Sequence, residues 1–210
     1  KPGKVKLIFD KVEGCARSFT IPNLKISKIV APGEELIINV PKAGTYTVNL
    51  TVTDNDGASG QSPPFQYLVV FDSSAGFVTG GGIINSPAGA LPQDPARTGK
   101  VNFSFSVKYL PGNLAPSGSS QFKYKVGNLN FQSTGYQWLV ITYPKAMIKG
   151  TGTINGIGNY TFWVSVIDGQ VAGGGGTDLF RIKITDNSGT VVYDTQMGAA
   201  DTADPTLPLV

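Results

Sequence analysis

The sequence predicts an all-β chain built as two antiparallel β-sandwich-like domains in tandem. Short runs rich in Thr, Val, Ile and Tyr alternate apolar and polar residues, as half-buried strands do. Turn residues separate these runs at short intervals, and the 210 residues include 27 Gly and 14 Pro. No segment reads as a helix. Together these observations are typical of an antiparallel β protein with many tight connections.

Six strands are expected in the first domain, residues 1–74. They cover residues 5–9, 18–21, 24–30, 35–40, 45–53 and 65–71. In the longest of them, Tyr46, Val48 and Leu50 alternate with Thr and Asn and therefore share one face. The turn DNDGASG then reverses the chain, and the two prolines before the last strand fit only a strand start or edge. Because this domain is short, we expect it to be incomplete or completed by a strand from a neighbour.

The second domain, residues 75–210, begins where the composition changes. The stretch SSAGFVTGGG after Asp72 is small and turn-rich, and all three Glu residues of the chain precede it. Nine strands are expected, at residues 76–85, 100–110, 119–126, 129–133, 136–143, 146–154, 160–167, 178–185 and 191–196. Turn signals such as VGN, STG and DNSG separate them. Phe103, Phe105 and Val107 alternate with polar residues, so we expect two stacked antiparallel sheets.

The composition excludes several functions. The chain has no histidine, which rules out a Ser-His or Cys-His nucleophile and removes the commonest metal ligand. The glycine runs VTGGGII and VAGGGGTD lack the Gly-Lys-Ser/Thr ending of a phosphate-binding loop. A net charge of +3 on scattered basic residues does not favour nucleic acid, and Lys123 and Lys125 are expected to face solvent on a strand. No apolar run is long enough for a membrane helix.

Two stretches resemble known families. AGTYTVNLTVTDNDGASG, within residues 43–72, resembles the closing half of a PKD-type immunoglobulin-like domain. From AGFVTGGGIINSPAGA to VVYDTQMGAADTADPT, residues 75–206 resemble the bacterial exported module called post-COAP-1. That resemblance implies a secreted or cell-surface protein and no established reaction. In such a setting the single cysteine, Cys15, is either a small buried apolar residue or a reactive thiol.

Aspartates in turns form the strongest candidate cluster. Asp54 and Asp56 lie in DNDG, and Asp168 and Asp178 flank a glycine-rich loop. Calcium takes about six to eight oxygen ligands, which flexible Asp/Asn/Gly loops supply, so calcium is the one cofactor that the sequence suggests. The same residues also occur in turns because their side chains cap the backbone. A glycosidase pair would need two such carboxyls to converge in one cleft.

Aromatic residues give a second candidate site, because sugar rings stack on exposed aromatic faces. The candidates are Tyr136, Trp138 and Trp163, from a wider group of aromatics that also includes Tyr143 and Tyr160. Period-two alternation places Tyr136 and Trp138 on one face of their strand and Trp163 opposite Phe162 on another. For each of these aromatics, core packing is the favoured interpretation.

The function expected from these patterns is a non-enzymatic structural or interaction module. Its partners would be other copies of the chain or neighbouring domains of a longer one. An open edge on the first domain would accept a strand, so pairing of residues 4–10 between copies would build an extracellular fibre. The alternative is a calcium-assisted module that binds carbohydrate or matrix.

Overall fold

The computed structural model describes residues 3–8, 16–30, 35–40, 44–53, 58–61, 65–70, 76–110, 113 and 115–210. The regular secondary structure in these residues is strand, apart from one short 3-10 helix, η1 (Pro22–Leu24). The prediction of an all-β chain is therefore confirmed. The chain divides into two compact units, unit 1 (Lys1–Asp72) and unit 2 (Ser73–Val210).

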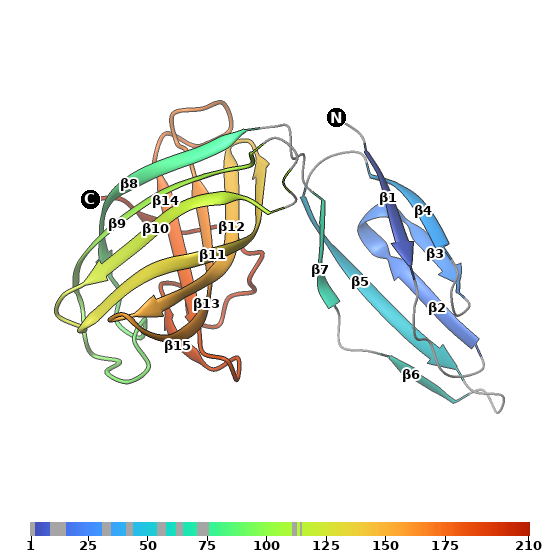
Figure 1. Ribbon diagram of the computed structural model, residues 1–210, viewed down its shortest axis with the longest axis horizontal. Helices are drawn as coiled ribbons and strands as arrows, with labels where there is room; N and C mark the ends of the chain where they lie inside the picture. The colour runs from blue at the N-terminus through green and yellow to red at the C-terminus, as the bar shows by residue number, and fades with distance from the viewer. Residues whose placement is uncertain are drawn as a thin grey trace. The chain divides into compact units, whose positions relative to one another are not determined.

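Unit 1 contains two groups of paired strands (Figure 1). Strands β1 (Gly3–Ile8) and β4 (Glu35–Val40) form an antiparallel pair. The larger group has the order β3-β2-β5-β6, and β7 also pairs with β5. Its strands are β2 (Ala16–Ile21), β3 (Ile26–Ile29), β5 (Gly44–Thr53), β6 (Ser59–Gln61) and β7 (Phe65–Val70).

The two groups of unit 1 share one hydrophobic core. Along β4, Leu36, Ile38 and Val40 are buried while Ile37 is 62% exposed, which is the alternation of a strand with one packed face. The core cluster joins these side chains to others from β2, β5 and the end of β3: Phe19, Ile21, Val30 and Tyr46. The β1–β4 pair is thus packed against the larger sheet through β4.

Unit 2 is one nine-stranded antiparallel sheet, so the prediction of two stacked sheets is wrong here. The strand order is β15-β14-β13-β12-β11-β10-β9-β8, and the short β16 pairs with β14. The strands are β8 (Phe77–Ser86), β9 (Gly99–Lys108), β10 (Ser117–Tyr124), β11 (Leu129–Thr142), β12 (Lys145–Ile154), β13 (Ile157–Ile167), β14 (Leu179–Thr185), β15 (Val191–Asp194) and β16 (Leu207–Pro208). From β8 to β15, every two strands that follow one another in the sequence are paired.

Strand β11 explains why one sheet replaces two. The sequence predicts separate strands at 129–133 and 136–143, but β11 is continuous. Its register against β12 shifts between Ser133 and Gly135 and again between Tyr136 and Trp138, so STG forms an irregularity within a strand and not a turn. Such bulges bend and twist a strand, which lets a single sheet curl over itself.

The curled sheet of unit 2 packs its first strands onto its last ones. Figure 1 shows β8 to β10 curving across β13 and β14. The rings of Phe103 on β9 and Phe180 on β14 stack with their centroids 3.9 Å apart. The edges also approach each other, since Tyr193 Oη donates to Ser86 Oγ at 2.8 Å and the Val210 N–H donates to the Ile83 carbonyl at 2.9 Å. The sheet therefore encloses one core between its own two ends.

We call the enclosed side of this sheet the inner face and the opposite side the outer face. The inner face carries the large aromatic core, and the buried side chains Phe103, Phe105 and Val107 of β9 lie on it as predicted. The outer face of β9 and β10 is polar and exposed. Lys123 and Lys125 are exposed, as expected for solvent-facing lysines. None of the helical segments in the described residues has the length and apolar character needed to cross a membrane.

Candidate functional site

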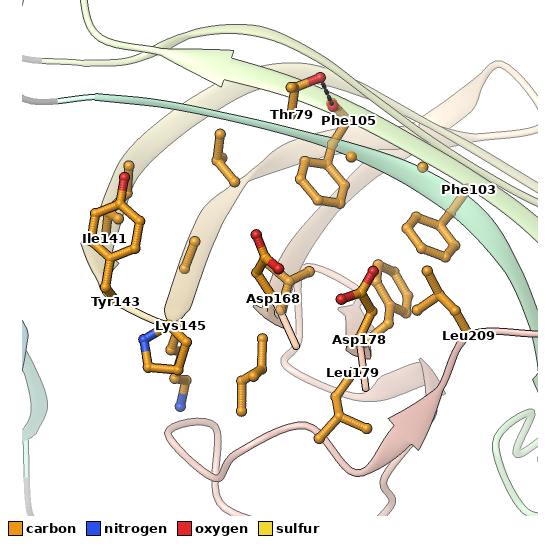
Figure 2. A pocket seen from close by; sticks show the side chains of 18 of the residues that line it. Thr79, Phe103, Phe105, Ile141, Tyr143, Lys145, Asp168, Asp178, Leu179 and Leu209 are labelled. Carbon is orange, nitrogen blue, oxygen red and sulfur yellow. Dashed lines mark hydrogen bonds between the residues drawn. The ribbon is translucent and has the colours of Figure 1, made fainter. Parts of the chain in front are cut away.

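A pocket of about 290 Å³ opens at one end of the curled sheet in unit 2. We call it the end pocket (Figure 2). Phe103, Phe105 and Phe180 line it from the inner face, where they are almost completely buried. Phe77 and Tyr143 also line it and are 67% and 81% exposed. The pocket therefore combines an aromatic interior with aromatic rings that remain open to solvent.

The glycines of VTGGGII shape one wall of the end pocket. A Cβ on Gly80 would lie 2.6 Å from Phe105 Cζ, and a Cβ on Gly82 would lie 2.9 Å from Leu209 Cδ2. Both glycines therefore leave room for side chains that pack directly on the backbone of β8.

Asp168 and Asp178, which flank the glycine-rich loop, line another side of the pocket. The Gly169 N–H donates to Asp178 Oδ1 at 2.8 Å, and the Gln170 N–H donates to Asp168 Oδ1 at 2.9 Å. The Gly176 N–H also donates to the Gly169 carbonyl at 2.9 Å, which closes the loop on itself. Both aspartates thus cap backbone groups, which is one of the two roles that the sequence allowed.

Both of these carboxylates also line the end pocket. Figure 2 shows Asp168 and Asp178 side by side, with their carboxylates directed at the space beneath the Phe105 and Phe103 rings. Asp168 is exposed and Asp178 is half-buried. Asp168 Oδ2 and Asp178 Oδ2 accept no hydrogen bond among the described residues. The structure therefore brings together the second predicted aspartate pair at the mouth of a cavity.

The described residues contain no group of three or more acidic, Cys or His side chains arranged to hold a metal ion. At the end pocket only two carboxylates are present, and calcium would need further oxygens from backbone, ligand or water. The other predicted pair, Asp54 and Asp56, lies outside the described residues, as does Cys15. Calcium binding remains a prediction.

Among the described residues, Lys145 is the one basic side chain in the lining of the end pocket. Its ammonium donates to Asp204 Oδ1 at 2.8 Å and to the Thr202 carbonyl at 3.0 Å. The positive charge of Lys145 is therefore already matched by a carboxylate that does not line the pocket. Asp168 and Asp178 leave the pocket itself with a negative balance.

The three predicted ligand-binding aromatics lie away from the end pocket. Trp138 and Trp163 pack edge to face at 4.8 Å on the outer face and are 8% and 7% exposed. Tyr136 packs instead against Phe162 on the inner face, with ring centroids 5.9 Å apart. The expectation that Tyr136 and Trp138 share a face is wrong, because the second register shift of β11 lies between them. Trp163 does face away from Phe162, as the alternation indicated.

A smaller cavity of about 220 Å³ lies on the outer face beside Trp163. Lys149, Lys183 and Asp201 also line it, and Lys149 Nζ lies 5.2 Å from the centroid of the Trp163 ring. Burial lowers the pKa of Lys149, and the charge of Asp201 opposes that change. Lys183 Nζ already donates to Asp201 Oδ1 at 2.6 Å. The ion pair between Lys183 and Asp201 therefore forms part of the lining of this cavity.

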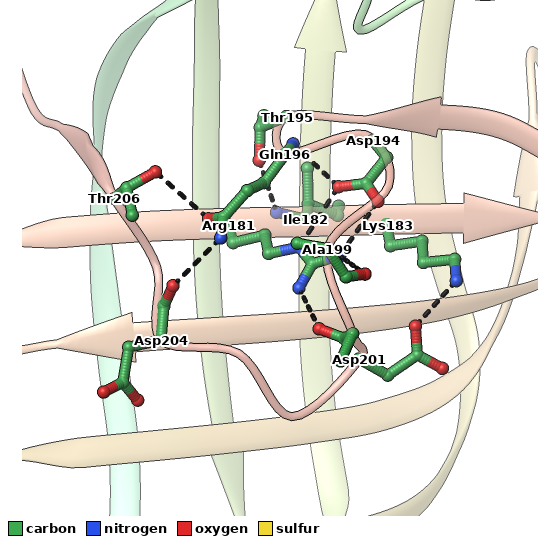
Figure 3. A network of polar contacts seen from close by, with 11 residues as sticks. Arg181, Ile182, Lys183, Asp194, Thr195, Gln196, Ala199, Asp201, Asp204 and Thr206 are labelled. Carbon is green, nitrogen blue, oxygen red and sulfur yellow. Dashed lines mark hydrogen bonds and ion pairs between the residues drawn. The ribbon is translucent and has the colours of Figure 1, made fainter.

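An ionic network, shown in Figure 3, ties the segment after β15 to the outer face. Arg181 Nε and Nη2 donate to the two carboxylate oxygens of Asp194 at 3.1 and 2.9 Å. Both side chains are nearly fully buried, and the remaining Arg181 donors reach the carbonyls of Ala199 and Ala200. Lys183 and Lys145 add contacts to Asp201 and Asp204. The aspartates after β15 are therefore structural anchors.

Sequence reasoning missed Phe77 and included Tyr143 only in the wider group of aromatic residues. Phe77 opens β8 and Tyr143 ends the run before the β11–β12 turn, so the two residues are far apart in the sequence. Curling of the sheet brings Phe77 to this pocket, whereas Tyr143 lies near Asp168 because the Asp168 N–H donates to the Pro144 carbonyl at 3.1 Å. In the sequence, the available indication was a large aromatic residue at the end of an expected strand. This indication of a ligand site was weaker than that of the Trp-containing runs.

Comparison with protein-family models, curated proteins and solved structures found no match for this chain. The resemblance of residues 43–72 to a PKD-type domain and of residues 75–206 to a post-COAP-1 module therefore stays a prediction from the sequence. What the chain does must be argued from its own geometry.

Proposed function

We propose that this chain is a non-enzymatic binding module that holds a carbohydrate ligand in the end pocket of unit 2. The observation that carries the proposal is the presence, in one pocket, of exposed aromatic rings and two carboxylates. Ligand sites are mostly apolar cavities in which a few polar groups orient the ligand, and the mouth of a curled or closed sheet is a common position for them. Phe77 and Tyr143 would stack on a sugar ring, while Asp168 and Asp178 would accept its hydroxyl hydrogens.

The solvent exposure and the hydrogen bonds of the two aspartates favour binding over catalysis. A glycosidase needs one carboxyl kept protonated by burial and a second that acts as base or nucleophile. Asp168 is exposed to solvent, and both carboxylates accept hydrogen bonds from the loop backbone. We therefore propose no reaction at this pocket.

The pairing of β1 argues against a fibre built by donating this strand. Gly3 to Ile8 of β1 pair with Val40 to Glu35 of β4, within the same unit. A strand already paired in its own unit is not available for a neighbouring copy without first breaking these hydrogen bonds. We therefore assign the interaction role to unit 2. The proposed secreted or cell-surface setting rests on the sequence resemblance alone.

A glycan array followed by calorimetric titration of the best-bound sugar tests the proposal. Tyr143→Ala and Phe77→Ala should each weaken binding about ten-fold or more, because each removes an exposed stacking surface. Ile157→Ala is the matched control, since Ile157 is 76% exposed at the β12–β13 turn and does not line the pocket. An array without any bound glycan, or equal losses in all three variants, would contradict the proposal.

Titration with calcium and with a chelator tests the calcium-assisted version of this function. Only two carboxylates line the pocket, so we expect sugar binding to persist after chelation. Binding that disappears with the chelator and returns with calcium would show that a cation completes the site.

A further inference from the structure

The charge of the end pocket narrows the chemistry of its ligand. The chain as a whole carries a net charge of +3, yet among the described residues that line the pocket two carboxylates stand against one ammonium, which Asp204 already holds. The local negative balance is therefore a property of the pocket and opposite in sign to the whole chain. Such a pocket favours a ligand that brings a positive charge.

The hydrogen-bonding groups of the pocket point in the same direction. The hydroxyl of Thr79 donates to the Phe105 carbonyl, and the Lys145 ammonium is held by Asp204 and Thr202. The acceptors Asp168 Oδ2 and Asp178 Oδ2 remain open among the described residues. A ligand that satisfies these acceptors must donate, and an ammonium group offers three donors and no acceptor.

The aromatic rings extend this complementarity to the body of the ligand. Phe105, Phe77 and Tyr143 present ring surface around the two carboxylates. Aromatic faces attract cations as well as apolar ring surfaces. The pocket volume of about 290 Å³ is at the small end of ligand sites, which suits a single ring with its substituents.

We infer that the end pocket recognises an amino sugar through its free ammonium group, held between the carboxylates of Asp168 and Asp178 while its ring packs on Phe77 and Tyr143. This inference rests on the proposed carbohydrate-binding function and names the sugar class. A neutral hexose fills the same space but leaves the two carboxylates with weaker partners, since hydrogen bonds between charged groups are the stronger ones.

The test is a titration of the full chain with D-glucosamine, D-glucose and N-acetyl-D-glucosamine. Glucosamine should bind about ten-fold tighter than glucose, and acetylation should abolish the preference because it removes the positive charge. Added salt should weaken glucosamine binding more than glucose binding. Equal affinity for glucosamine and glucose would overturn the inference while leaving the proposed function standing. Failure of all three sugars would overturn the inference, whereas the glycan array decides the proposed function separately.

Two substitutions test whether Asp168 and Asp178 cause the preference for glucosamine. Asp178→Asn keeps an oxygen that can accept from Gly169, and Asp168→Asn changes an exposed side chain, so at least the second should fold normally. Each should reduce the ratio of glucosamine affinity to glucose affinity, because asparagine lacks the negative charge but keeps one oxygen that can accept from a sugar hydroxyl. Asp186→Asn is the matched control, because Asp186 also caps a turn but lies at the other end of β14. A preference unchanged in Asp168→Asn and Asp178→Asn would overturn the inference.

The same ammonium chemistry occurs on a lysine side chain, and a fourth titration separates the two sources. Nα-acetyl-lysine methylamide carries the ammonium on a flexible chain without a sugar ring. Weaker binding than glucosamine supports the amino sugar, whereas tighter binding would overturn it in favour of a protein partner.

Discussion

At the scale of single residues, Arg181 and Asp194 form the most deeply buried charged contact that the structure describes in unit 2. Their side chains are 3% and 2% exposed, and two further carbonyls complete the hydrogen bonding of the guanidinium. A buried pair of this kind contributes little net stability when intact but is costly to break, because removal of one partner leaves a buried charge.

Asp194→Ala should therefore lower the free energy of unfolding by about 3–5 kcal/mol. Chemical denaturation of the variant and the native chain measures the difference. Asp204→Ala is the matched control, since Asp204 pairs with Lys145 but is 73% exposed, and should cost less than about 1 kcal/mol. Similar losses in the two variants would contradict the buried role of Asp194.

Asp186 gives a pH-dependent prediction. The hydroxyl of Ser188 and the backbone N–H of Thr190 hold the pKa of this carboxyl below its usual value of 3.8. A pKa that is lower in the folded state stabilises the fold above the unfolded pKa, and this stabilisation is lost as the pH falls through the folded pKa. Asp186→Ala should thus lower the melting temperature at neutral pH and have a smaller effect at pH well below 3.8.

Ser188→Ala removes the largest cause of that shift and is the companion experiment. An NMR titration should place the pKa of Asp186 closer to 3.8 in this variant than in the native chain. An unchanged pKa would show that Ser188 is not the cause.

At the scale of elements, regular strands were predictable and bulged ones were not. The alternation in β9 identified its buried and exposed residues because each side chain of a regular strand follows the period of two. In β11 the register shifts change this period locally, so Tyr136 and Trp138 lie on opposite faces. The first shift lies at STG, which the sequence pattern indicated as a turn, and no residue pattern marks the second shift.

A substitution of Trp138 tests whether its ring is part of the packed core and not of a ligand site. Trp138→Phe should cost about 1–3 kcal/mol, because it shortens a buried ring that packs on Trp163. Ligand binding at the end pocket should be unchanged, since Trp138 does not line it. Thermal unfolding and sugar titration on the same sample measure both effects. Normal stability with lost binding would return Trp138 to the ligand site.

At the scale of the whole molecule, the sequence predicted the fold class and missed the curling of the second sheet. Alternation and turns are local features, whereas curling depends on contacts such as Phe103 with Phe180 that join distant strands. The same limit applies to the candidate site. Asp168 and Asp178 were recognisable because one loop links them, but Phe77 reaches them only through the curling of the sheet and Tyr143 through the β11–β12 turn beside Asp168.

The closure of the sheet can be tested with Gly82 and Leu209. Gly82→Ala should destabilise unit 2 by about 1 kcal/mol, because the new Cβ would lie 2.9 Å from Leu209 Cδ2. In a Leu209→Ala background the same change should be neutral or stabilising, since the obstructing side chain is gone and alanine restricts the unfolded chain. Chemical denaturation of the native chain, the two single variants and the double variant gives the free energies of unfolding for this double-mutant cycle. Additive effects would mean that the two residues are not in contact.

The order of strands in unit 2 also has a consequence for how this unit acquires its structure. Every strand from β8 to β15 pairs with its sequence neighbour, so the ladder can grow hairpin by hairpin with only short loops to close. The hydrogen bond between Tyr193 and Ser86 instead spans 107 residues. We expect the paired strands to assemble early and the contact between β8 and β15 to form late. Partly folded intermediates should therefore lack the contact between these two edge strands.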